Sequence, residues 1–180
     1  MTLFISIRLP DEIQQYVQTI HNLLPKQHST FVLSKQYHIT LKFLGDVDKE
    51  KLEQIKTRLS SIFLKPFTLH LAPIGYFPDT QKIRVIWLGV EPQKEVGQLH
   101  EELEKILKDL FTKDERWHPH ITLARVKTIQ NKKLFANMMQ QIQIEPKVFT
   151  VHEFVLMESK LENGKYNHYE IEKYKVNGSS

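Results

Sequence analysis

Hydrophobic and polar positions alternate along this chain with two different periods. Residues 2–9 alternate apolar and polar side chains, which predicts a mostly buried first strand. The same two-residue period, or a short apolar run, predicts further strands at 37–45, 67–71, 83–88, 118–127, 148–157 and 166–176. Asn163-Gly164 is typical of a tight turn, so the last two strands are expected to pair as a hairpin.

Apolar residues spaced three and four apart predict four helices between these strands. The first starts at Pro10-Asp11-Glu12 and is stopped by Pro25, and the second is capped by Asp48. The others cover 93–111 and 131–141, while 26–30 and 75–79 are expected to be a polar connection and a loop. Interleaved helices and strands with hairpin-like pairs indicate an α+β or mixed α/β architecture. Without a low-complexity linker, residues 1–176 are expected to form one domain and 177–180 a disordered tail.

The amino-acid composition limits the classes of protein to which this chain can belong. With 180 residues, 41% of them hydrophobic and 26% charged, the chain has the composition of a globular domain. Its apolar runs are far shorter than the roughly 20 residues of a membrane-spanning helix. It has no cysteine, which excludes disulfides and thiolate zinc sites and fits a reducing compartment. No secretory leader is evident, so a cytoplasmic location is expected. The formal charge of +4 mildly favours anionic partners.

One tetrapeptide, His-Ile-Thr-Leu, occurs twice, at 38–41 and 120–123. Both copies lie in predicted strands, where residues two apart project from the same face, so each His shares a face with its Thr. The Ile and Leu residues then point into a core. A third His-x-Thr, at 28–30, lacks this alternating context and is interpreted as a coincidence.

Two such strands, brought together across a pseudo-twofold axis, would suit displacement at phosphorus. In-line chemistry places the entering and leaving oxygens on opposite sides, so one imidazole could take a proton from water and the other give one to the leaving oxygen. An unperturbed pKa of about 6.5 lets one ring be neutral and the other charged near neutrality. Threonine hydroxyls could donate to the nonbridging oxygens. No metal is needed in this scheme.

Several longer segments resemble a known family in order along the chain: 38–45 (HITLKFLG), 75–78 (GYFP) and 119–125 (PHITLAR), with weaker matches at 3–7 and 156–161. They look like the two-histidine (2H) phosphoesterase superfamily, and more closely like the RNA 2′,3′-cyclic phosphodiesterases, historically called 2′-5′ RNA ligases. The resemblance implies a bilobal duplicated α+β fold, with two antiparallel sheets flanking a central cleft and helices outside.

The resemblance also implies hydrolysis of a terminal ribose 2′,3′-cyclic phosphate to a 2′-phosphate, without cofactor or metal. It assigns the general acid to His38, the water-activating base to His120, and phosphate binding to Thr40, Thr122 and Arg125. Which histidine is acid and which is base stays open. Strict alternation from His120 places Arg125 on the opposite face, unless the strand bends or bulges after Leu123.

Other residues have weaker claims on the site. Phe77 and Trp117 are candidates for RNA or base contacts, whereas Phe43 is expected to be packed. Lys42 and Arg116 could steer RNA phosphates. His118 and His120 form an H-x-H pair, but the neighbourhood lacks a ligand set for a metal, so His118 is interpreted as a rim residue. The remaining histidines, at 21, 70, 100, 152 and 168, are given no role.

Three functions remain open on the sequence. The leading one is an RNA 2′,3′-cyclic phosphodiesterase. It is expected to act on RNA ends as a monomer and not to associate with a membrane. The second is a 2′-5′ RNA ligase or 2′-5′ phosphodiesterase at the same site, because in-line chemistry is reversible. The third is a nucleotide-end binding module without turnover, which two intact proton-transfer groups disfavour.

Overall fold

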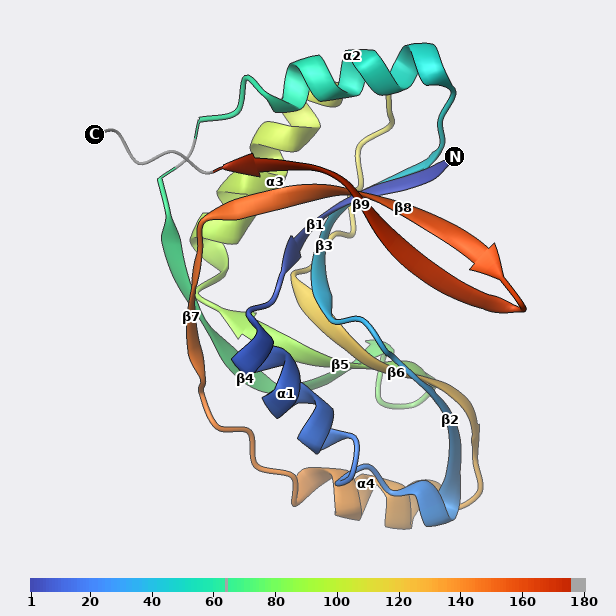
Figure 1. Ribbon diagram of the computed structural model, residues 1–180. Helices are drawn as coiled ribbons and strands as arrows, with labels where there is room; N and C mark the ends of the chain where they lie inside the picture. Colours follow the sequence, from blue (N-terminus) through green and yellow to red (C-terminus); the bar gives the residue numbers. More distant parts are fainter. Residues whose placement is uncertain (64, 176–180) are drawn as a thin grey trace.

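The computed structural model describes residues 1–63 and 65–175, and its strands form one curled antiparallel sheet (Figure 1). The expected tail, 177–180, lies outside the described residues. The sheet order is β7-β4-β5-β6-β3-β1-β8-β9, with β2 added on β6. The strands are β1 (Thr2–Arg8), β2 (Ser29–Leu33), β3 (His38–Asp46), β4 (Phe67–Pro78), β5 (Ile83–Glu91), β6 (His120–Ile129), β7 (Val148–Val151), β8 (Glu153–Glu162) and β9 (Lys165–Lys175).

Four helices cover the outside of the sheet in the described chain. They are α1 (Asp11–Ile20), α2 (Lys49–Leu59), α3 (Gln93–Leu107) and α4 (Lys132–Gln140), and a short 3₁₀ turn, η1 (Lys26–His28), precedes β2. Figure 1 shows α2 and α3 together at one end of the molecule and α1 and α4 at the other. Their apolar stripes pack on the core face of the sheet, where Val17, Ile55 and Leu99 are fully buried.

The sheet has two parts that meet at a single residue pair. One part holds β3, β1, β8 and β9, and the other holds β6, β5, β4, β7 and β2. Between them, β3 and β6 pair antiparallel only at Ile39 and Ile121. The α+β class with antiparallel strands and outer helices is therefore confirmed, and the two expected sheets are continuous through this one contact.

The order of elements also repeats. The first part of the chain runs β1-α1, then β3-α2, and the later part runs β5-α3, then β6-α4. The first helix of each repeat packs beneath the other repeat's histidine strand: α3 contacts β3, and His21 at the end of α1 reaches Leu123 of β6. This crossover buries the residues around the junction, because each strand is covered by a helix from the other half of the chain.

Several boundaries differ from the sequence expectation. The helix expected to run to Pro25 ends at Ile20, although Leu24 is still buried. The strand expected to end near 71 continues to Pro78, because the predicted loop pairs with β5. β2 was missed, since its burial pattern depends on pairing with β6 and not on an apolar run. The segment expected as one strand from 148 is divided into β7 and β8.

Candidate active site

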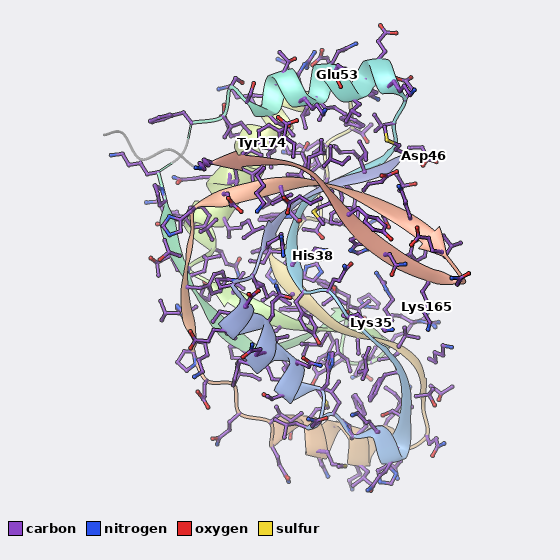
Figure 2. The ribbon with its side chains drawn as sticks, in the orientation of Figure 1. Lys35, His38, Asp46, Glu53, Lys165 and Tyr174 are labelled. Atoms are coloured by element: carbon purple, nitrogen blue, oxygen red, sulfur yellow. The ribbon has the colours of Figure 1, made fainter. Side chains whose placement is uncertain are left out.

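The two His-Ile-Thr-Leu segments open β3 and β6 at the junction between the two parts of the sheet. Because Ile39 is paired with Ile121 in an antiparallel register, His38 stands opposite Thr122 and Thr40 opposite His120. All four side chains therefore share one face of the sheet, called the site face below, and all four are partly exposed. Ile39, Leu41, Ile121 and Leu123 point the other way and are completely buried. Figure 2 shows His38 near the centre of the molecule.

The ring of His38 lies against an aromatic side chain and another histidine. Its centroid is 5.1 Å from Phe4 of β1 and 5.3 Å from His168 of β9. The pKa of His38 is lowered to about 4, first by burial of the ring and then by the neighbouring His168 and His120, while a backbone hydrogen bond with Gln36 opposes the shift. The register of β3 and β6 places the two imidazoles on the same face, and His120 is one of the groups that act on the pKa of His38.

The ring of His120 has a different aromatic wall. Its centroid is 4.9 Å from Phe77 of β4 and 6.0 Å from Trp87 of β5. The His118 carbonyl accepts a hydrogen bond from Nδ1 at 2.7 Å. In a neutral ring this leaves the lone pair on Nε2, which suits a proton acceptor. Burial lowers the pKa of His120, against the His118 hydrogen bond, which raises it; the charges of His118 and Arg125 lower it further.

His168 was given no role on the sequence, and the structure places it beside His38. Its backbone is held by Gln36, whose side chain accepts from the His168 N–H and donates to its carbonyl. Its ring is 4.9 Å from Phe4, burial lowers its pKa, and its buried Nδ1 has no hydrogen-bond partner in the described part of the protein. The sequence carries no local signal for this contact, because β9 reaches the site face only through its pairing with β8.

A β-bulge at the last residue of each motif decides where the side chains after it point, Arg125 among them. Ile5 and Ser6 pair with Lys42 and Thr40, so Leu41 is an extra residue in β3. Ile86 and Trp87 pair with Ala124 and Thr122, so Leu123 is the extra residue in β6. A bulge reverses the alternation of the residues that follow it.

The reversal returns the second residue after each bulge to the site face. Ala124 is buried and Arg125 is exposed, and the charge of Arg125 acts on the pKa of His120. The conflict between strict alternation and a site role for Arg125 is thus removed by the bulge at Leu123. On β3 the same reversal buries Lys42 and exposes Phe43.

Each bulged residue has its carbonyl bonded to a buried histidine. His100 Nδ1 of α3 is 2.8 Å from the Leu41 oxygen, and His21 Nε2 is 3.0 Å from the Leu123 oxygen. The Leu123 oxygen also accepts from the backbone N–H of Ser34 at 2.9 Å. On its other side His21 Nδ1 meets the Tyr37 hydroxyl at 3.1 Å. Because a carbonyl can only accept, His21 donates from Nε2, and Tyr37 donates to Nδ1.

Some expected contacts are organised differently. Trp117 stacks on His100 with 4.0 Å between ring centroids and donates from Nε1 to the Thr40 carbonyl at 2.9 Å, so it supports the backbone of the first motif. Lys42 is buried in an ion pair with Glu104 at 2.7 Å, so it is not available to steer RNA. Phe43, expected to be packed, is 69% exposed. Arg116 lies in an exposed turn, and His118 contacts Phe77 and Trp87 at the margin of the site.

Neither a metal-ligand cluster nor a membrane helix is found in residues 1–63 and 65–175. No three His, Asp or Glu side chains of this part of the chain are grouped closely enough to hold a metal ion. None of its helices is both long and apolar enough to cross a bilayer. What the site face offers instead is two imidazoles, two hydroxyls and one guanidinium, a set that can bind an oxyanion and move protons on either side of it.

Comparison with known proteins agrees with this arrangement. The 2′-5′ RNA ligase superfamily matches residues 9–163. An RNA 2′,3′-cyclic phosphodiesterase of Methanocaldococcus jannaschii is 35% identical over 142 residues, which cover 78% of this chain and 80% of that protein.

Two solved structures share the fold over nearly the whole chain. A protein of Thermus thermophilus superposes with a TM-score of 0.80 at 24% identity and covers 100% of both chains. E. coli LigT complexed with 3′-AMP superposes with a TM-score of 0.76 at 26% identity and covers 98% of both chains.

Proposed function

This chain belongs to the 2′-5′ RNA ligase superfamily, and from that membership we propose that it is an RNA 2′,3′-cyclic phosphodiesterase. It hydrolyses a terminal ribose 2′,3′-cyclic phosphate and leaves a 2′-phosphate. The observation that carries the proposal is the pair of His-Thr sets on one face of the sheet, related by the Ile39–Ile121 pairing. A relative named for this activity is 35% identical over most of both chains.

In this reaction a water oxygen bonds to phosphorus and the bond from phosphorus to the 3′ oxygen breaks. His120 takes the proton from water at Nε2, the nitrogen left unprotonated when Nδ1 donates to the His118 carbonyl. His38 gives a proton to the departing 3′ oxygen. Thr40 and Thr122 donate hydrogen bonds to the nonbridging oxygens, and Arg125 balances their charge. Phe77, beside His120, is a contact for the terminal nucleotide.

The lowered pKa of His38 bears on its role as acid. A ring with a pKa of about 4 carries no proton in the free protein near neutrality. The acid therefore becomes charged when the phosphate anion binds, because a neighbouring negative charge favours the imidazolium form. Substrate binding and proton uptake are coupled in this proposal.

The proposal also covers the setting of the reaction. The enzyme acts without a metal or cofactor, as a cytoplasmic monomer, with residues 1–176 as one domain. The absence of cysteine from the sequence supports a reducing compartment. The five polar groups of the site face supply acid, base and anion binding without a further component.

The test follows the end of an RNA oligonucleotide that carries a 2′,3′-cyclic phosphate. In EDTA, the protein is expected to convert the cyclic end to a 2′-monoester. A new 2′-5′ linkage as the main product would favour ligation at the same site, and binding without turnover would favour a nucleotide-end binding module. Loss of activity in EDTA that returns with a divalent metal would contradict the metal-independent scheme.

A further inference from the structure

The positive charge of this chain is concentrated in two of its segments. Residues 80–90 and 116–144 contain seven Lys and Arg residues and no Asp or Glu. The rest of the chain has the other 18 of the 25 Lys and Arg residues against all 21 Asp and Glu residues, so it is slightly acidic by itself. The two segments hold most of β5, the whole of β6 and the helix α4. Because β5 and β6 pair, the fold gathers these cations beside the strand that carries Arg125.

A pocket, called the α4 pocket below, lies where the turn before β5 and the end of β6 meet the first half of α4. Its apolar lining includes the half-buried Ile83 and Val126 and the buried Phe135. No Asp or Glu is among the described residues that line it, whereas four exposed cations are: Lys82, Arg84, Lys127 and Lys132. Its volume of about 180 Å³ is below the roughly 300–1,000 Å³ of a site that encloses a small ligand. The α4 pocket is therefore suited to one part of a longer anionic chain.

The α4 pocket is continuous with the phosphate-binding end of the site. Val85 of β5 pairs with Arg125 of β6. One position further along these two strands, Arg84 and Val126 line the pocket. Lys127 follows Arg125 by two residues on β6, a span of about 7 Å, and it is exposed. A phosphate held by Arg125 thus lies at one end of a run of cations that leads into the pocket.

The opposite flank of the site attracts anions less. The β8–β9 hairpin reaches the site face with His168, but residues 153–175 contain five Glu against four Lys. Lys160 of this hairpin is already paired with Glu158 at 3.3 Å. Since the affinity of proteins for nucleic acid depends largely on cations that neutralise phosphates, the charge distribution favours the side of β6 as the path of an RNA chain.

We propose that the α4 pocket binds the RNA chain on the 5′ side of the nucleotide that carries the cyclic phosphate. This inference rests on the proposed function for the identity of the ligand as an RNA end. The phosphates of these upstream nucleotides contact the four cations, and a ribose or a base covers the apolar lining. Contacts with phosphates carry no base information, so the pocket favours RNA chains over mononucleotides without selecting a sequence.

The test compares the equilibrium binding of two ligands with a 2′-phosphate end, an oligonucleotide of six uridines and uridine 2′-phosphate alone, to the full-length protein. Lys82→Gln/Lys132→Gln is expected to weaken oligonucleotide binding about 10-fold more than mononucleotide binding, because only the longer ligand reaches the pocket. The slope of log Kd against log salt concentration should also fall by about 1.4 for the oligonucleotide, since each phosphate contact of a single strand contributes about 0.7.

Lys49→Gln/Lys94→Gln is the matched control. It removes two exposed lysines from α2 and α3, at the other end of the molecule from α4 (Figure 1), and should keep both the affinity ratio and the salt slope. Unchanged oligonucleotide affinity in the pocket variant would overturn the inference, and so would an equal loss for both ligands or an equal loss in the control. A wild type that binds the oligonucleotide through the pocket but leaves a cyclic end intact would contradict the proposed function alone.

Discussion

At the scale of single residues, the two site histidines differ in what surrounds each ring. His120 has its tautomer fixed by the His118 carbonyl and lies beside Phe77. His38 lies beside Phe4 and a third histidine, His168. One motif in two settings therefore gives two imidazoles whose pKa values are lowered by burial and by different neighbouring groups.

The charge of His168 is expected to set part of the proton affinity of His38. His168→Phe keeps an aromatic ring beside His38 but removes the titrating charge, so the pKa of His38 should rise above about 4. It should stay below the ordinary value of 6.5, because burial is the larger cause and is kept. A histidine titration followed by NMR measures this shift directly.

The pH profile provides the kinetic counterpart. If His38 is the acid, a higher pKa keeps it protonated to higher pH. The alkaline limb of the kcat/KM profile should therefore shift to higher pH in His168→Phe. His152→Phe, at an exposed position in the short break between β7 and β8, is the control and should leave both limbs in place. A His38 pKa that stays constant or falls would show that His168 does not act on it.

Side-chain roles could be predicted only where the motif itself carried them. The shared face of each His and Thr followed from strand periodicity, and the structure brings the four side chains together. The exposure of Phe43, the ion pair of Lys42 and the place of His168 depend on bulges and on strands that are distant in sequence. Local alternation cannot reveal them, because a single extra residue reverses every direction that follows.

At the scale of elements, the paired bulges are the feature that shapes the site. Each is formed at the last residue of its motif, and the carbonyl of that residue is bonded to a buried histidine of the other repeat, His100 in α3 or His21 at the end of α1. The helix-to-strand contacts therefore control which side chains reach the site face. His21 also joins the two motifs, since it contacts Tyr37 beside His38 as well as the Leu123 oxygen.

His21 bonds the carbonyl of Leu123, the bulged residue that directs Arg125 to the site face. Removal of this hydrogen bond is expected to weaken the contact of Arg125 with the phosphate. His21→Leu loses a hydrogen bond worth about 1 kcal/mol net, so kcat/KM for the cyclic phosphate should fall about fivefold. His21→Gln, which keeps a nitrogen donor, should retain most of the activity. The loss should be much smaller in the Arg125→Ala background, because the part of the His21 effect that passes through Arg125 is already gone, while the contact with Tyr37 remains.

His100→Leu is the matched variant in the other repeat. His100 bonds the bulge at Leu41, which sets the direction of Phe43 and not of Arg125. The effect of His100→Leu on kcat/KM should therefore persist in the Arg125→Ala background. Steady-state kinetics of the single and double variants give both comparisons. If His21→Leu lowers kcat/KM by the same factor with and without Arg125, the hydrogen bond from His21 to Leu123 contributes only to the stability of the fold.

Element boundaries were predictable where local signals set them. The Asp48 side chain caps α2 by accepting from the Lys51 N–H at 2.8 Å, as its position before an apolar stripe predicts. The Asn163-Gly164 turn closes the β8–β9 hairpin with both residues at positive φ. β2 and the outer half of β4 have no comparable signal, because partners far along the chain define them.

At the scale of the whole molecule, the fold brings together two repeats of one arrangement of strands and helices. In the described residues, the two parts of the sheet pair with each other only at Ile39 and Ile121, inside the two histidine motifs. The repeated tetrapeptide and the family resemblance predicted this duplication. The crossed helices beneath the strands were not predictable from periodicity, which says which face of a helix is buried but not which strand covers it.

The central claim is that both imidazoles act on one phosphate, and turnover by the two histidine variants tests it most directly. His38→Ala and His120→Ala should each lower kcat on a 2′,3′-cyclic-phosphate oligonucleotide by about 10²–10⁴. The double variant should fall little below the weaker single variant, because two groups that work as a unit are not additive. Near-wild-type turnover by either single variant, or a double loss equal to the product of the two, would contradict the account.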